Sequence, residues 1–103
     1  MENTEEYALF GKMTAQPGQR EALLSILLQA AQLVSTAKGC HQYLVYKDTQ
    51  HQDCIWISEI WDSKADHDAS LTIAGCKELI MQAMPLLAGK PERTELTLSG
   101  GKR

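Results

Sequence analysis

The sequence predicts a single α+β domain whose elements follow the order strand, helix, strand, strand, helix, strand. Three observations predict it. Four segments are rich in β-forming residues, two longer segments repeat leucine and alanine at three- and four-residue intervals, and glycine, proline or polar stretches separate them. A length of 103 residues suits one domain, which we expect to fill 1–103, with a core at 7–99 and a short polar tail at 100–103.

The first half of the chain supplies three of these elements. β-forming residues alternate over 7–14, and the turn-forming sequence at 16–18 ends the strand. Apolar residues at helical spacing predict a helix over 19–37, and Gly39 stands where a helix C-terminal glycine is expected. Aromatic and β-branched residues then predict a strand over 41–47.

The second half begins with the strongest strand of the chain, 54–61, which a short polar loop joins to the preceding strand as an antiparallel hairpin. Ser63 and Asp66 have the spacing of a helix N-terminal cap, so a short helical turn should start there. Apolar residues predict a longer helix over 76–87, which Pro85 should disturb near its last turn.

Alternation over 93–99 predicts a half-buried last strand, with Thr94, Leu96 and Leu98 on one side. The complete order is the split βαβ pattern of ferredoxin-like domains, βαββαβ. We therefore expect a four-stranded antiparallel sheet with the helices on one face.

Both faces of the 54–61 strand carry large apolar side chains. By alternation, one side holds Ile55, Ile57, Glu59 and Trp61, and the other holds Cys54, Trp56, Ser58 and Ile60. Two helices cover only one face of such a sheet, so the second face needs another cover. We expect an identical chain to supply it in a homodimer. The alternative is that the first helix or the tail wraps around this face.

Charge and composition argue against several partners. Ten Lys and Arg against thirteen Asp and Glu give a net charge of -3 without a basic cluster, so neither nucleic acid nor a membrane surface is expected. The longest apolar stretch, 23–34, is too short to cross a membrane. The acidic N-terminus lacks the features of a secretory signal, so we expect a cytoplasmic protein. Cys40, Cys54 and Cys76 should be small buried thiols.

Glu59 and Trp61 end the third predicted strand, and His67 follows in the next helix. This arrangement resembles the strand-to-helix motif of the antibiotic biosynthesis monooxygenase family. The resemblance extends over about 7–101. Gly39, Tyr43 and Tyr46 sit where the family has a glycine before its second strand and aromatic residues within that strand.

The segment 84–96 and the glycines after it resemble a bacterial subgroup described as quinol monooxygenases. What the resemblance implies is a dimeric α/β barrel in which each subunit holds a pocket between sheet and helices. It also implies, for some members, oxygenation of phenolic or quinol-like aromatic substrates with molecular oxygen and no metal, flavin or other cofactor.

Oxygenation without a cofactor needs a base, an apolar pocket and donors for the developing negative charge. His67 is the expected base because its ordinary pKa lies near neutral pH. Trp61 offers an indole N–H and a stacking surface, and Tyr43 or Tyr46 offers a hydroxyl to a small aromatic ligand. Glu59 shares the face of Trp61, where burial would raise its pKa.

Each of these residues also has a structural interpretation. His67 lies between two aspartates and could be a solvated surface residue, and Trp61 could serve core packing alone. Tyr43 and Tyr46 differ by three positions, so at most one should line a given pocket. Glu59 could be a structural hydrogen-bond acceptor or ion-pair partner.

The second hypothesis for function is a non-catalytic, dimeric ligand-binding or stress-response protein that uses the same pocket. A metal site is not expected, because no two histidines have helical i, i+4 spacing, and Cys40 and His41 diverge on a strand. Related haem-degrading enzymes have an asparagine on the first strand. Residues 8–14 contain none, which argues against that activity.

Overall fold

The computed structural model describes residues 6–102 of the chain, and its elements agree closely with those expected from the sequence. They are β1 (Glu6–Thr14), α1 (Arg20–Val34), β2 (Cys40–Lys47), β3 (Cys54–Trp61), α2 (Lys64–Ser70), α3 (Cys76–Ala83), the 3₁₀ turn η1 (Met84–Leu86) and β4 (Glu92–Leu98). Within this range no helix is long and apolar enough to cross a membrane. Residues 1–5, on which the exclusion of a secretory signal partly depends, and Arg103 of the predicted tail lie outside it.

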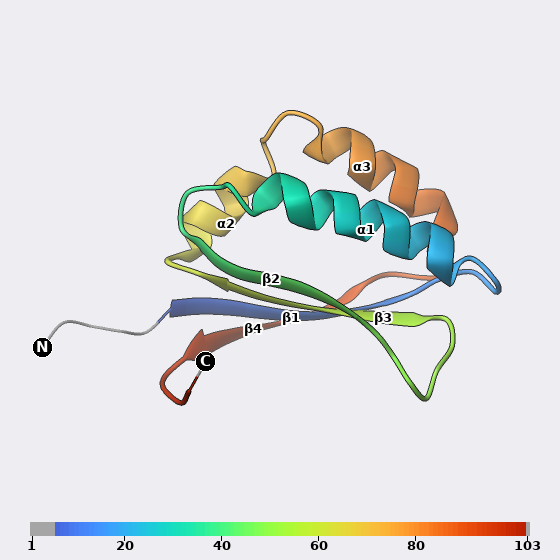
Figure 1. The fold of residues 1–103 in the computed structure, drawn as a ribbon, viewed down its shortest axis with the longest axis horizontal. Helices are drawn as coiled ribbons and strands as arrows, with labels where there is room; N and C mark the ends of the chain where they lie inside the picture. Colours follow the sequence, from blue (N-terminus) through green and yellow to red (C-terminus); the bar gives the residue numbers. More distant parts are fainter. Residues whose placement is uncertain (1–5, 103) are drawn as a thin grey trace, which may run out of the picture.

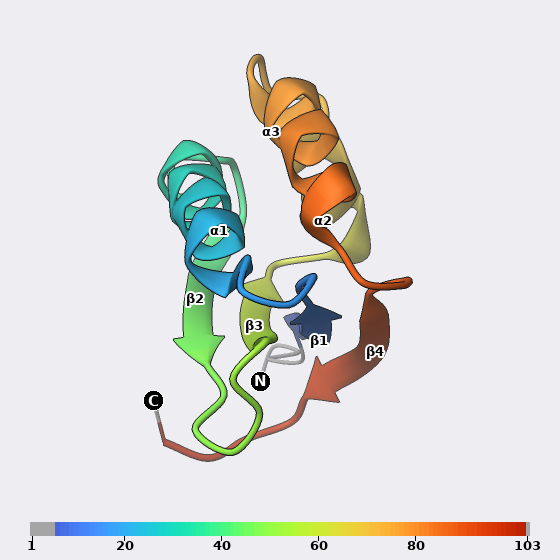
Figure 2. The ribbon, with the colours of Figure 1, turned by 90° about the vertical axis from the view of Figure 1, so that its right-hand side faces the viewer.

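The four strands form one antiparallel sheet in the order β2-β3-β1-β4. All helices lie over one face of this sheet, and the other face is left open (Figures 1 and 2). The expected α+β, ferredoxin-like βαββαβ fold is therefore confirmed.

Pro85 acts as predicted, whereas the first helix ends before the position that Gly39 indicated. Pro85 ends the last helix as expected, because α3 stops at Ala83 and the chain continues in η1. The first helix ends at Val34, three residues earlier than predicted. The chain then turns tightly to Gly39, whose φ of 80° is in the left-handed region. A Cβ at Gly39 would overlap the carboxylate of Asp66 on α2, so the turn and the helix pack closely.

The core lies between α1 and the helix-facing side of the sheet. Its centre is formed by Leu23 and Leu27 on α1 with Ile55 and Ile57 on β3, all buried. These four belong to one helical stripe and one alternating strand face, which is the pattern that predicted them. Burying each such side chain contributes roughly 1.5–3 kcal/mol.

The prediction of a half-buried β4 was wrong for this chain. Every residue of β4 except Leu98 is exposed, and Leu96 is half-exposed. The reason is that β4 is an edge strand whose apolar side faces away from the helices. The apolar residues that predicted the last helix are also only partly buried, because α3 packs mainly against α1 and leaves Ile80 exposed, as is Met84 at the start of η1.

The open face of the sheet carries large apolar side chains on each of its four strands. Its exposed large side chains are Phe10 on β1, Leu44 and Tyr46 on β2, and Leu96 on β4. The rings of Phe10 and Trp56 stack with centroids 5.3 Å apart, and together with Tyr46 they line a shallow depression of about 490 Å³. The two-sided character predicted for β3 is thus observed, because Trp56 lies here while Trp61 is buried under the helices.

The three cysteines are free thiols. Cys54 and Cys76 are buried as predicted, whereas Cys40 at the start of β2 is only partly buried.

Candidate active site

The end of β3 and the helix α2 bring three of the predicted site residues together. Glu59 and Trp61 alternate onto the helix-facing side of β3, and α2 carries His67 over them. Trp61 Nε1 donates to Glu59 Oε1 at 2.9 Å, and His67 Nε2 lies 3.7 Å from the same oxygen. The Trp61 and His67 rings meet edge to face, with centroids 5.7 Å apart and planes at 84°. All three side chains are buried.

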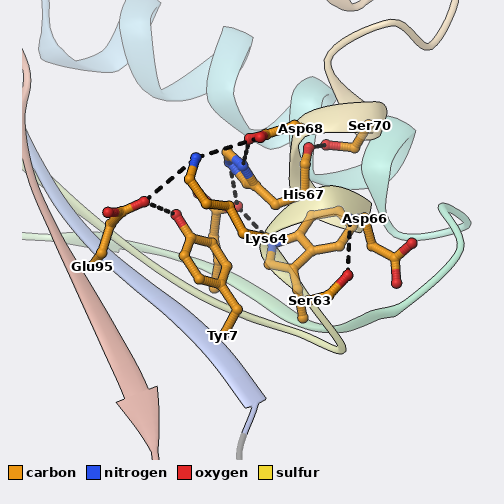
Figure 3. Close-up of polar contacts among 10 residues, drawn as sticks. Tyr7, Ser63, Lys64, Asp66, His67, Asp68, Ser70 and Glu95 are labelled. Carbon is orange, nitrogen blue, oxygen red and sulfur yellow. Dashed lines mark hydrogen bonds and ion pairs between the residues drawn. The ribbon is translucent and has the colours of Figure 1, made fainter.

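Local sequence explains how His67 reaches this position. The Ser63 hydroxyl accepts the Asp66 backbone N–H at 3.1 Å, which caps α2 at the spacing predicted from the sequence (Figure 3). The cap places His67 one turn beyond Ser63 on α2, facing the sheet, where it is 5% exposed. The Ser70 hydroxyl donates to the His67 carbonyl at 2.6 Å and holds that turn.

A neighbouring carboxylate orients the imidazole of His67. Nδ1 lies 3.0 Å from Asp68 Oδ1, and a carboxylate can only accept, so Nδ1 donates the proton. In the neutral ring Nε2 then carries the lone pair on the side of Glu59. The hydrogen bond from His67 lowers the pKa of Asp68 and keeps this carboxylate ionised at neutral pH.

The outer rim of the site joins α2 to the first and last strands. The Tyr7 hydroxyl donates to Glu95 Oε2 at 2.7 Å, and the Lys64 ammonium lies 3.6 Å from Glu95 and 3.4 Å from Asp68 (Figure 3). The Tyr7 ring is 5.7 Å from that of His67. Burial, followed by the hydrogen bond to Glu95, raises the pKa of Tyr7 to about 12, so its hydroxyl remains protonated.

The buried acid at the centre has a perturbed ionisation. Burial raises the pKa of Glu59, and the Trp61 N–H and the positive charge of a protonated His67 oppose that rise. Tyr43 is the cross-strand partner of Glu59 on β2, and burial, together with the nearby Glu59 charge, raises the pKa of its hydroxyl. Tyr43 is therefore a neutral donor on the site's face of the sheet.

The structure separates Tyr46 from these residues. Its ring lies on the open face, and its hydroxyl pairs with the Ser58 hydroxyl at 2.8 Å. The expectation that Tyr43 and Tyr46 face opposite sides is confirmed, so Tyr46 does not join the His67 cluster of its own chain. The alternative of His67 as a solvated surface residue is wrong, because its ring is buried.

Sequence reasoning missed the rim residues Tyr7, Lys64, Asp68 and Glu95. Two signals were available. Lys64 and Asp68 have the i, i+4 spacing of an ion pair on the helix that carries His67. Tyr7 stands two positions before Leu9 on β1, so both side chains lie on the face that packs against the helices. Glu95 gave no such signal, because its contact with Tyr7 spans 88 positions.

The His67 cluster does not offer a metal-binding arrangement. Its two carboxylate partners contact opposite nitrogens of one ring, so the three groups cannot share an ion. Among residues 6–102, donors that converge on one point are found instead at Glu6, His41 and Asp62.

Comparison with known proteins agrees with this fold. Residues 7–80, from β1 into α3, match the family model described as antibiotic biosynthesis monooxygenase. A candidate antibiotic biosynthesis monooxygenase from Chloroflexus aurantiacus J-10-fl shares 42% identity over 95% of this chain and 97% of that chain, with a TM-score of 0.85.

Two more distant structures share the fold. A Nitrosomonas europaea protein of unknown function is 24% identical over 99% of this chain and 97% of that chain, with a TM-score of 0.82. A candidate antibiotic biosynthesis monooxygenase from Deinococcus radiodurans is 21% identical over 94% of each chain, with a TM-score of 0.74. No curated protein matches the chain significantly. On the family match over 7–80 and the 42% identity to the Chloroflexus protein, this chain belongs to the antibiotic biosynthesis monooxygenase family.

Proposed function

We propose that the chain is a cofactor-independent monooxygenase that oxidises small quinols or related polyphenols with molecular oxygen in the cytoplasm. The observation that supports this most is the setting of His67, a buried imidazole with Nδ1 held by Asp68 and Nε2 directed toward Glu59. Family membership supports the oxygenase class. Free thiols at all three cysteines fit a reducing compartment.

In this proposal His67 Nε2 removes a phenolic proton. The 3.7 Å gap to Glu59 is longer than a hydrogen bond, so Nε2 keeps its capacity to accept one from a substrate hydroxyl. The imidazolium that forms lies between the carboxylates of Asp68 and Glu59, which stabilise its charge. Asp68 acts as a positioning residue, because it fixes the tautomer that leaves Nε2 free.

The substrate supplies all the electrons for the reaction. The phenolate passes an electron to O₂, and the two radicals combine to form a bond between a ring carbon and oxygen. The O–O bond then breaks. One oxygen atom stays on the ring, and the other leaves as water with two hydrogens from the substrate, so a hydroquinone plus O₂ gives a hydroxyquinone plus water.

The ligand pocket in this proposal lies between α2 and the end of the sheet. Trp61 provides the apolar wall and Tyr43 a neutral hydroxyl, whereas Tyr46 is assigned to the open face. The Lys64 ion pairs with Asp68 and Glu95 span the rim of the site. Exposed ion pairs of this kind are weak, so a substrate can separate them as it enters.

The proposal includes a homodimer formed through the open faces of two sheets. Four large apolar side chains there are half-exposed in the single chain. If each loses about 80 Å² to a partner, two copies bury about 640 Å² of apolar surface, which is worth roughly 16 kcal/mol before the cost of association. That gain is large enough to support a stable pair.

Oxygen uptake with a panel of hydroquinones tests the activity. We expect His67→Gln to lower the rate about 100-fold or more, the usual contribution of a general base. We expect Asp68→Asn to lower it less and to shift the pH profile, since it disturbs the tautomer. His51→Gln is the matched control, because His51 is an exposed loop histidine beside Asp48. With ¹⁸O₂, one labelled atom should appear in the quinone.

Full turnover in His67→Gln would contradict the assignment of the base. Absence of uptake with every substrate, combined with thermal stabilisation by the same compounds, would instead support the non-catalytic ligand-binding function.

A further inference from the structure

A second cluster of polar side chains lies away from His67, where the start of β1, the start of β2 and the end of β3 meet. His41 Nε2 is 3.1 Å from Glu6 Oε2 and 2.5 Å from Asp62 Oδ1. The three donor atoms lie within 4.8 Å of one another. One imidazole and two carboxylates from three separate segments thus converge on one point.

The backbone is arranged to bring these groups together. Strand pairing shifts register between Cys40 and Gln42, so His41 is the extra residue of a β-bulge. Bulges re-aim side chains and are frequent beside functional sites. The Asp62 N–H donates to the Gly39 carbonyl at 2.8 Å, which fixes the end of β3 against the start of β2.

We propose that Glu6, His41 and Asp62 bind a divalent transition-metal ion of the Zn²⁺ class. Imidazole nitrogen and carboxylate oxygen are ordinary ligands of such an ion. With bonds of about 2.1 Å, tetrahedral donors lie about 3.4 Å apart, close to the 3.1 Å between His41 and Glu6. Asp62 must move outward by less than about 1 Å, and its exposed side chain is free to rotate.

The cluster differs from ordinary surface ion pairs in its number of ligands. His51 also contacts a carboxylate, that of Asp48, but at 3.6 Å and with no third ligand nearby among the described residues. At the proposed site three protein ligands leave a fourth position for water. A bound ion would join three strand ends at the rim of the open face.

The site lies outside the proposed catalytic cluster. By alternation Glu6 shares the open face with Ala8, whereas His67 lies over the opposite face. Nothing in the spacing of residues 6, 41 and 62 predicts such a site, because the ligands meet only after the strands pair.

Titration of the full chain with Zn²⁺ alone, followed by calorimetry, tests the site. We expect one ion per chain and a loss of affinity of more than about tenfold in His41→Gln and in Asp62→Asn, since even indirect contacts to a metal usually contribute that much. His51→Gln and Cys40→Ser should bind like the wild type. Cys40→Ser excludes the adjacent, partly buried thiol as the ligand.

A measurement on the unmodified protein covers the case in which a variant fails to fold. Zn²⁺ should shift the ring ¹⁵N resonances of His41 and leave those of His51 unchanged. Binding that survives both His41→Gln and Asp62→Asn, shifts confined to other histidines, or no binding at millimolar Zn²⁺ would each overturn the proposal and leave His41 as an ion-pair partner only.

Discussion

Replacing Phe10 by Asp should convert the proposed dimer into a monomer. Phe10 lies on β1, one of the two central strands, stacks on Trp56 and is 42% exposed in the single chain. In a symmetric dimer the same residue is lost from both copies. The change also places a carboxylate from each chain into the interface, where desolvation opposes it.

The expected loss of dimer stability follows from the exposed area of the Phe10 side chain. Phenylalanine exposes about 200 Å² when free, so 42% corresponds to about 80 Å² per chain and about 160 Å² per dimer. At about 25 cal/mol per Å² this burial is worth about 4 kcal/mol, or roughly 1,000-fold in the dissociation constant. Desolvation of the two carboxylates adds to that loss.

Sedimentation velocity at micromolar concentration measures the outcome. The wild type should sediment at twice the monomer mass of 11.4 kDa, and Phe10→Asp at the monomer mass. Met81→Asp is the matched control, because Met81 is 61% exposed on α3, away from the open face. A monomeric wild type, or a Phe10→Asp variant that remains dimeric, would refute the assignment of this face.

Three further changes test the fold and the site. Gly39→Ala should lower the free energy of unfolding in urea by about 1–2 kcal/mol, because Gly39 has a positive φ. The loss should exceed that in Gly18→Ala, since Gly18 has a similar φ but no atom near an added Cβ. Leu23→Ala should cost about 2–5 kcal/mol because it leaves a cavity in the core. Burial raises the pKa of Glu59 above its ordinary 4.5, so its contribution to stability is present below pH 4.5 and is lost as the pH rises through the folded-state pKa. Glu59→Gln should therefore gain stability relative to the wild type between acidic and neutral pH, and an unchanged difference between pH 4 and pH 7 would contradict the burial argument.

The order of the elements along the chain and the two faces of β3 could be predicted because they depend on local patterns. Alternation along a strand is a property of neighbouring residues, so Trp56 and Trp61 were placed on opposite faces correctly. Alternation does not say which face is covered. Leu96 was expected to be buried because it is apolar, yet it lies on the face without helices.

The candidate site was predictable where its residues are close in the chain. Glu59, Trp61 and His67 lie within nine positions, and the Ser63 cap fixes the turn between strand and helix. The contact between Tyr7 and Glu95 depends instead on the pairing of the first and last strands. No local pattern sets that register, so the rim of the site emerged only from the folded chain.

Strand β3 connects the proposed catalytic site with the proposed dimer interface. Its alternate residues place Glu59 and Trp61 in the candidate site and Trp56 on the open face, within a single strand. A partner that holds the open face would also restrict movement of the strand beneath the site. A loss of activity in Phe10→Asp greater than in Met81→Asp, at equal stability, would show that assembly supports catalysis, whereas equal activity in a proven monomer would show that each site is complete within its own chain.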